Sequence, residues 1–320
     1  MQRKEWSYVV TPAVNSHTAL RRFRRSFKRH WILYLLLVVP LAYIITFAYT
    51  PMVGLLMAFE DYRPTRGIFG SKWVGLKHFE RFLSMPIFFT LLKNTVIISL
   101  YSLVAGFPMP IILALALNEV RITKLKKTVQ MVSYAPYFIS TVVMVGIIMQ
   151  FFSPQFGPIN ILRRNMGLST INFMGEQSMF RSIYVWSGVW QGSGYGAVIY
   201  IAAIAGIDPQ LHEAALIDGA NRFQRLWHVD IPGILPTVVI MLIMNCGSIM
   251  SVGYEKIYLM QNSLNTSVSE VISTYVYKVG LKEAQYSFSA AVGMFNSVVN
   301  FIMLVLVNGI SRRVSETSLW

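Results

Sequence analysis

The residues of this 320-residue chain whose types and spacing could do chemistry fall into two groups. One is a stretch of charged and small residues between two long apolar runs, Glu213-Ala214-Ala215-Leu216-Ile217-Asp218-Gly219. The other is a set of amide, hydroxyl and indole side chains inside the apolar runs: Trp190, Gln191, Asn245, Ser248, Asn296 and Asn300. An exposed carboxylate among small residues suits docking against a basic partner, whereas neutral amides and aromatic faces suit a hydroxyl-rich ligand.

Neither group contains a catalytic or metal-binding arrangement. His212-Glu213 has Leu216 where a zinc-protease helix needs its second histidine. Residues 67–72 lack the spacing of a phosphate-binding loop, and Gly192-Ser-Gly194-Tyr-Gly196 lacks that of a dinucleotide-binding turn. We therefore predict that the chain is not an enzyme, that it has no catalytic or metal site, and that it does not itself hydrolyse ATP.

Composition places the chain in a membrane. Apolar residues make up 54% of it and charged residues 13%, against about 25% charged in a soluble domain. The single cysteine, Cys246, lies in an apolar run, which favours a buried small hydrophobe and excludes an internal disulfide. Six runs contain no Asp, Glu, Lys or Arg and are long enough to cross about 30 Å of hydrocarbon: 31–59, 94–118, 128–152, 182–206, 234–254 and 287–310.

In lipid each spanning segment must satisfy its own backbone, so these runs are expected to be helices. An even number of spans puts both termini on one side, and basic residues favour the cytoplasm: 16 Lys and Arg lie on that side against 11 outside. We predict three parts: a basic cytoplasmic segment, 1–30; a six-helix domain, 31–310, with a cytoplasmic loop at 207–236; and a cytoplasmic tail, 311–320. The basic segment indicates contact with anionic lipid, not nucleic acid.

The loop has local signals for a helix, a sharp turn and a second helix. Asp208 is an N-cap acceptor, and Pro209 follows at the first helical position. Gly219 suits a left-handed turn at the end of that helix, and Asn221 suits the cap of the next. Pro232 and Pro236 are expected to stop the second helix and mark the start of the fifth span.

Apolar side chains in this loop, among them Leu211, Leu216 and Phe223, leave two interpretations open: an amphipathic helix on the membrane face, or a helix laid in a partner's groove. The second is favoured because small alanines permit close approach and Glu213 can pair with a basic side chain. The stretch resembles the EAA motif of permease subunits in binding-protein-dependent ABC importers, with Glu213, Ala214, Ala215 and Gly219 at the motif positions. The resemblance implies a coupling helix that docks into a separate ATPase.

The resemblance covers nearly the whole chain. Lys93-Asn94-Thr95, the run from Leu113 to Glu119 and Asp218-Gly219-Ala220 resemble carbohydrate-uptake permeases of the maltose-transporter type. Three further segments, 134–138, 272–277 and 318–320, resemble a subfamily associated with oligosaccharides and polysaccharide fragments. The implied fold is an all-α integral membrane protein of about six transmembrane helices, the type I ABC importer permease fold.

The resemblance also implies the rest of the assembly. It comprises a second related permease in a heterodimer, two ATPase subunits that bind ATP and Mg²⁺, and an extracellular solute-binding protein. The chain itself would bind no cofactor. It would lie in a bacterial cell membrane and form half of the pathway for sugar import.

The polar residues of the spans are candidates for that pathway. On the sixth run Gly293, Asn296, Ser297 and Asn300 recur at one helical face, and the fifth contributes Asn245 and Ser248. Because no span carries an acidic, basic or histidine side chain, a proton-coupled transporter is disfavoured and a neutral glycan is expected as cargo. An ABC permease for another solute, such as a peptide, and a stand-alone facilitator remain alternatives.

Overall fold

The structure, a computed structural model, describes residues 16–314 and 318, and side chains from residue 29 onward. The first half of the basic segment and the end of the predicted tail therefore lie outside the described residues. The chain divides into two compact units, 1–56 and 57–320.

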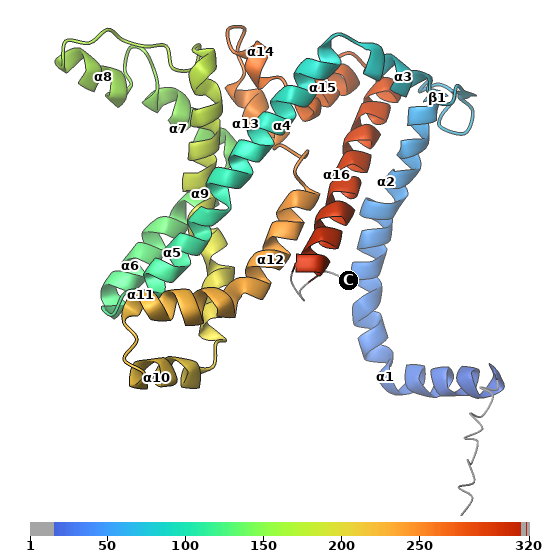
Figure 1. Cartoon of the computed structure of the whole chain (residues 1–320). Helices are drawn as coiled ribbons and strands as arrows, with labels where there is room; N and C mark the ends of the chain where they lie inside the picture. Colours follow the sequence, from blue (N-terminus) through green and yellow to red (C-terminus); the bar gives the residue numbers. More distant parts are fainter. Residues whose placement is uncertain (1–15, 315–317, 319–320) are drawn as a thin grey trace, which may run out of the picture. The chain divides into compact units, whose positions relative to one another are not determined.

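The described part of the first unit is helical, with one kink. It contains α1 (Ser16–Ile44), a π-helical turn (Ile45–Tyr49) and α2 (Thr50–Met52), and a 3-10 helix (Val53–Phe59) continues from it. A kink at His30 separates the basic part of α1 from the apolar run Arg29–Phe59, as Figure 1 shows. Apolar side chains along this run are exposed, for example Leu36 and Val39, as expected of a helix that faces lipid.

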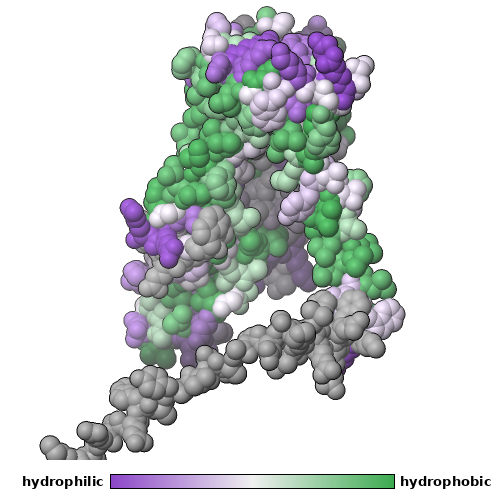
Figure 2. Space-filling view, turned by 90° about the vertical axis from the view of Figure 1, so that its right-hand side faces the viewer, coloured by the Kyte–Doolittle hydropathy of each residue, from purple (hydrophilic) through white to green (hydrophobic). Residues whose placement is uncertain are grey.

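The second unit begins with a small polar cap before its first long helix. β1 (Glu60–Asp61) pairs antiparallel with β2 (Lys72–Trp73), and α3 (Lys77–Ser84) follows. This two-stranded sheet is a minor departure from an all-α fold. Figure 2 shows hydrophilic side chains gathered at the end that carries these elements and hydrophobic side chains below them.

Two predicted spans of this unit are interrupted by proline. α4 (Ile87–Gly106) and α5 (Pro108–Glu119) still form one helical run, because the prolines lie in the first turn of α5, where a missing N–H costs little. By contrast α6 (Thr123–Tyr134), a 3-10 turn (Ala135–Phe138) and α7 (Thr141–Phe151) meet at a bend of 102°. Ser140 caps α7 after the bend, so run 128–152 is a broken span or a re-entrant loop.

A central helix positions the others. After the short α8 (Pro158–Asn165), α9 (Gln177–Ala205) runs beside α4, α5, α6 and α12 (Figure 1). The approach is closest at Gly194, where a Cβ atom would lie 1.9 Å from the Ser133 carbonyl oxygen. A Cβ at Gly196 would be 3.1 Å from Pro110, whereas one at Gly192 would meet nothing within 4 Å.

The remaining elements run from the loop to the last helix. They are α10 (Pro209–Ile217), α11 (Arg222–Arg225), a π-helical turn (Leu226–Asp230), α12 (Ile231–Gly247), α13 (Tyr254–Met260), α14 (Thr266–Ser269), α15 (Ile272–Tyr277), a second π-helical turn (Lys278–Lys282) and α16 (Tyr286–Val314). α12 packs beside α16, and α10 and α11 lie at the end opposite α13, α14 and α15 (Figure 1).

Two sequence expectations for the fifth span were wrong. Pro232 and Pro236 do not stop the helix that begins at Arg222, since it continues to Gly247. The wide π-helical turn, in which the Ile231 N–H bonds to the Leu226 carbonyl, leads the chain into Pro232 in the first turn of α12. The helix then ends at Gly247, not at residue 254, because Asn300 of α16 accepts the Met250 N–H and holds residues 248–253 in a turn.

Within the described residues, four helices are long and apolar enough to cross a membrane, or five if the bent pair counts as one span. The chain is therefore a multi-pass membrane protein. α9 is 29 residues long but is not among the four. The count of six spans, like the division into three parts, stays a prediction.

Buried side chains form three clusters that meet α9 or α16. One joins α4, α7, α9 and α13 around Ile98, Met144 and Phe180. A second joins α3, α4 and α16 around Phe82, Leu91 and Phe288, and the third joins α5, α9 and α12 around Tyr200. Cys246 is buried, as expected.

Candidate functional site: the loop at 208–230 and the central cavity

The predicted cap, turn and second cap of the loop are all present. The Asp208 carboxylate accepts the Gln210 N–H at 2.9 Å at the start of α10. Gly219 has φ +75°, and the Ala220 N–H returns to the Ala215 carbonyl at 2.9 Å, which closes the helix end. Asn221 and Gln224 then exchange side-chain and backbone hydrogen bonds in a capping box at the start of α11.

α10 buries none of its residues, although much of its side-chain surface is apolar. Glu213 is exposed, and so are Leu216 and Ile217, the latter by 87%. Phe223 and Trp227 extend this apolar surface beyond the glycine turn, exposed by 75% and 64%. A short helix that covers no core and exposes large apolar side chains beside a carboxylate has the chemistry expected of a docking surface.

One polar contact connects α10 to the long helix behind it. His212 Nε2 lies 3.5 Å from Asp230 Oδ1, and Asp230 is buried at the junction of the π-helical turn with α12. α10 is therefore connected to α12 both through the chain and by this contact.

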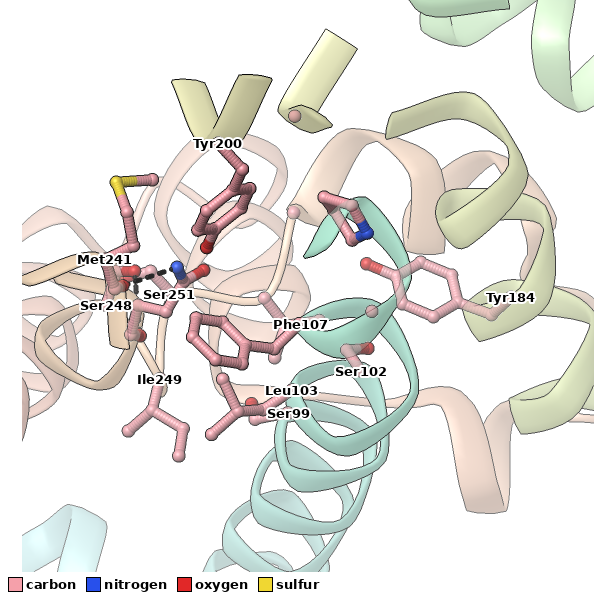
Figure 3. Close-up of a pocket in the computed structure, with 16 residues that line it drawn as sticks. Ser99, Ser102, Leu103, Phe107, Tyr184, Tyr200, Met241, Ser248, Ile249 and Ser251 are labelled. Atoms are coloured by element: carbon pink, nitrogen blue, oxygen red, sulfur yellow. Dashed lines mark hydrogen bonds between the residues drawn. The ribbon is translucent and has the colours of Figure 1, made fainter. Parts of the chain in front are cut away.

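The far end of α12 reaches a cavity of about 390 Å³ enclosed by α4, α5, α9 and the turn 248–253. Its wall is rich in hydroxyl and amide groups: Ser99, Ser102, Tyr200, Asn245, Ser248 and Ser251. Figure 3 shows Tyr184 and Tyr200 projecting from α9 toward this space. Ser99 Oγ is buried and makes no hydrogen bond with a described residue.

A second cavity of about 380 Å³ adjoins the first and shares four residues with it: Ser102, Gly106, Pro110 and Tyr184. Gln191 and Lys256 line the second cavity. Hydroxyls, amides and tyrosine rings in a confined space can hydrogen-bond a polyol and cover its apolar faces.

The structure brings together three of the six pathway candidates. Asn245 and Ser248 line the first cavity, and Asn245 Nδ2 donates to the Met241 carbonyl of its own helix at 2.7 Å. Gln191 lines the second cavity, where its Nε2 donates to the Ile139 carbonyl at 2.9 Å and so satisfies the bend between α6 and α7.

The other three lie elsewhere. Trp190 is half-exposed in a largely apolar cavity between α5, α6 and α9. Asn296 lines a further cavity beside α15, where its Oδ1 is buried without a hydrogen bond to any described residue. Asn300 forms two hydrogen bonds with the turn 248–253, each of 2.8 Å. Its Oδ1 accepts the Met250 N–H, and its Nδ2 donates to Ser251 Oγ. Asn300 therefore positions the cavity wall.

Sequence reasoning missed Ser99, Ser102, Tyr184, Tyr200 and Lys256. Ser99 and Ser102 are three residues apart on one helix face. A search of the second run for polar residues that recur on one face, as was done for the sixth run, could have found them. The tyrosines and Lys256 gave no comparable signal, because their positions depend on how α9 and α13 are rotated against their neighbours.

Comparisons with known proteins show the family to which the chain belongs. The family described as "Binding-protein-dependent transport system inner membrane component" matches residues 106–316. The chain is 42% identical over 288 residues to the polygalacturonan/rhamnogalacturonan transport system permease protein YteP of Bacillus subtilis, covering 90% of each chain. It is 41% identical over 295 residues to Protein LplB of the same organism, covering 92% of this chain and 93% of that one.

The fold is also similar to a solved transporter. A chain in the crystal structure of a bacterial alginate ABC transporter, in complex with an alginate pentasaccharide-bound periplasmic protein, superposes with a TM-score of 0.85 at 37% identity. The match covers 93% of this chain and all of that one.

Proposed function

The chain belongs to the family of binding-protein-dependent transport system inner membrane components, and from that premise we propose that it forms half of the pathway through which an ATP-driven importer takes up an oligosaccharide. It is a transport subunit and not an enzyme. Relatives named for polygalacturonan, rhamnogalacturonan and alginate transport support a saccharide as cargo.

The observation that carries this proposal is the path of one helix. The exposed, capped α10 and its glycine turn lead through α11 and the π-helical turn into α12. The other end of α12 supplies Asn245 and Ser248 to the hydroxyl-rich cavity. One element thus links a docking surface to a candidate ligand site. Closure of an ATPase on ATP would move α10, and α12 would carry that movement to the cavity wall.

The assembly needs further subunits. A second related permease would supply the opposite wall of the pathway, two ATPase subunits would bind ATP and Mg²⁺, and an extracellular binding protein would deliver the sugar. The similarity to a transporter solved with its periplasmic protein supports the last of these. The distribution of basic residues supports cytoplasmic termini in a bacterial cell membrane.

The test is the sugar-stimulated ATPase activity of the complete transporter in liposomes. Glu213→Arg together with Gly219→Trp reverses the charge of α10 and fills its turn, so we expect stimulation to be lost while the subunits still assemble. Glu80→Arg is the matched control, because it reverses an exposed carboxylate in α3 that makes no ion pair with the described residues. Full stimulation in the double variant would overturn the assignment of α10.

A further inference from the structure

Lys256 places a cation in the second cavity. It lies in the first turn of α13, and its half-buried side chain reaches back to α9. Its Nζ donates to the Tyr184 carbonyl at 3.1 Å and lies 4.9 Å from the centre of the Tyr184 ring. Gly188 leaves room for it, since a Cβ there would be 3.3 Å from Nζ.

This ammonium has no counter-charge within the described part of the chain. No described carboxylate lies within 4 Å of it, whereas Lys278 pairs with Glu270 and Lys77 with Asp61. α13 is not among the candidate spans, and burial lowers the pKa of Lys256 to about 8. A partly dehydrated cation without a partner costs stability, so its retention in a cavity points to a ligand that supplies the missing charge.

The surroundings define that ligand. The adjoining walls offer hydroxyls, amides and the Tyr184 and Tyr200 rings, which match a sugar, while Lys256 adds one positive point charge. We propose that Lys256 is a specificity-determining residue that pairs with the carboxylate of an acidic sugar unit, a uronate, as an oligosaccharide enters the cavity. This inference rests on the proposed function and replaces the expectation of a neutral glycan.

The pairing needs no change in covalent structure. A carboxylate that enters beside Tyr184 would accept hydrogen bonds from the three-donor ammonium, and the other sugar hydroxyls would face Ser102 and Gln191. Gln191 already donates one amide hydrogen to Ile139, which leaves its carbonyl oxygen and its second N–H for a sugar hydroxyl.

The experiment compares two probes that differ in charge. Uptake of trigalacturonate and of its fully methyl-esterified, neutral form is measured in liposomes with the complete transporter, carrying wild-type, Lys256→Met or Lys256→Arg chains. The binding protein is the same throughout, so a change in the ratio of the two uptake rates reports on this chain. Lys282→Met is the matched control, because Lys282 also lies over a tyrosine ring, that of Tyr258, but on the exposed surface.

We expect Lys256→Met to lower trigalacturonate uptake about tenfold, the size of a charge-assisted contact, and ester uptake less than about twofold. Lys256→Arg should retain most of the acidic uptake, and Lys282→Met should change neither rate. If Lys256→Met lowered the uptake of both probes equally, the inference would be overturned in favour of a packing role or a pair with the second permease. If it lowered the uptake of neither, the inference would also be overturned. Wild-type uptake of the ester but not the acid would leave the proposed function standing and refute the inference. Uptake of neither probe would also refute the inference, whereas the proposed function falls only if no oligosaccharide stimulates the ATPase activity of the complete transporter.

Discussion

His212 Nε2 of α10 lies 3.5 Å from Asp230 Oδ1, a carboxylate that is 1% exposed at the start of the helix leading to the central cavity. This Asp230 oxygen makes no hydrogen bond with the described residues, so the contact with His212 is an electrostatic one. The pair therefore joins the proposed docking helix to the helix that lines the candidate ligand site.

Removing either partner should weaken coupling between sugar and ATPase activity, and removing both should be no worse than removing one. We expect His212→Ala and Asp230→Ala to show a coupling energy of about 1 kcal/mol in a double-mutant cycle of sugar-stimulated ATPase rates. His228→Ala is the control, because His228 bonds to the Gln224 carbonyl and not to Asp230. Additive effects of the first two substitutions would show that the pair transmits nothing.

Gly219→Ala should destabilise the loop through backbone strain alone. The residue has φ +75°, and a Cβ there would meet nothing within 4 Å, so the cost is that of the left-handed conformation, about 1–2 kcal/mol. Gly146→Ala in α7 has equal space but no positive φ, and it should be neutral or slightly stabilising. Thermal unfolding of the purified protein measures both, and equal effects would contradict the assigned cause.

Gly194 and Gly192 provide a matched pair on α9. Alanine at 194 would place Cβ 1.9 Å from the Ser133 carbonyl and force α6 away, whereas alanine at 192 enters open space. We expect Gly194→Ala to lower the free energy of unfolding by about 1–3 kcal/mol or more, and Gly192→Ala to leave it nearly unchanged. Comparable melting temperatures for the two variants would mean that α6 and α9 do not pack as described.

Acid should weaken the polar cap at β1 and α3. A hydrogen bond from Lys77 holds the pKa of Asp61 below its usual 3.8, so the stabilisation is present above that pH and is lost as pH falls through the lower, folded-state pKa. Because the Lys77–Asp61 ion pair is at the surface, it stabilises the fold by at most about 1 kcal/mol. Lys77→Met should therefore lower the melting temperature slightly at pH 6, and by progressively less as the pH falls below 3.8. An equal loss at every pH would assign the effect to packing.

The loop was predictable because its signals are local. The Asp208 cap, the Gly219 turn and the Asn221 cap each depend on a few neighbouring residues, and all three predictions were confirmed. Pro232 was misread because its effect depends on the π-helical turn before it. The end of α12 depends on Asn300, about 50 positions later in the chain, which sequence spacing does not reveal.

The cavity was only partly predictable for the same reason. Asn245, Ser248 and Gln191 were found because a polar residue in an apolar run is visible in the sequence. Trp190 and Asn296 carry the same signal but face other cavities. Lys256 lies just beyond a predicted span, and only the packing of α13 on α9 shows that it reaches the ligand space.

The most direct test of the central claim is accumulation of a labelled oligosaccharide in liposomes that contain this chain, its partner permease, the ATPase and the binding protein. The account predicts accumulation above the outside concentration only when ATP and a competent ATPase are present, and loss of accumulation in the Glu213→Arg, Gly219→Trp variant. Entry at the same rate without the ATPase, or accumulation that survives the double substitution, would contradict it.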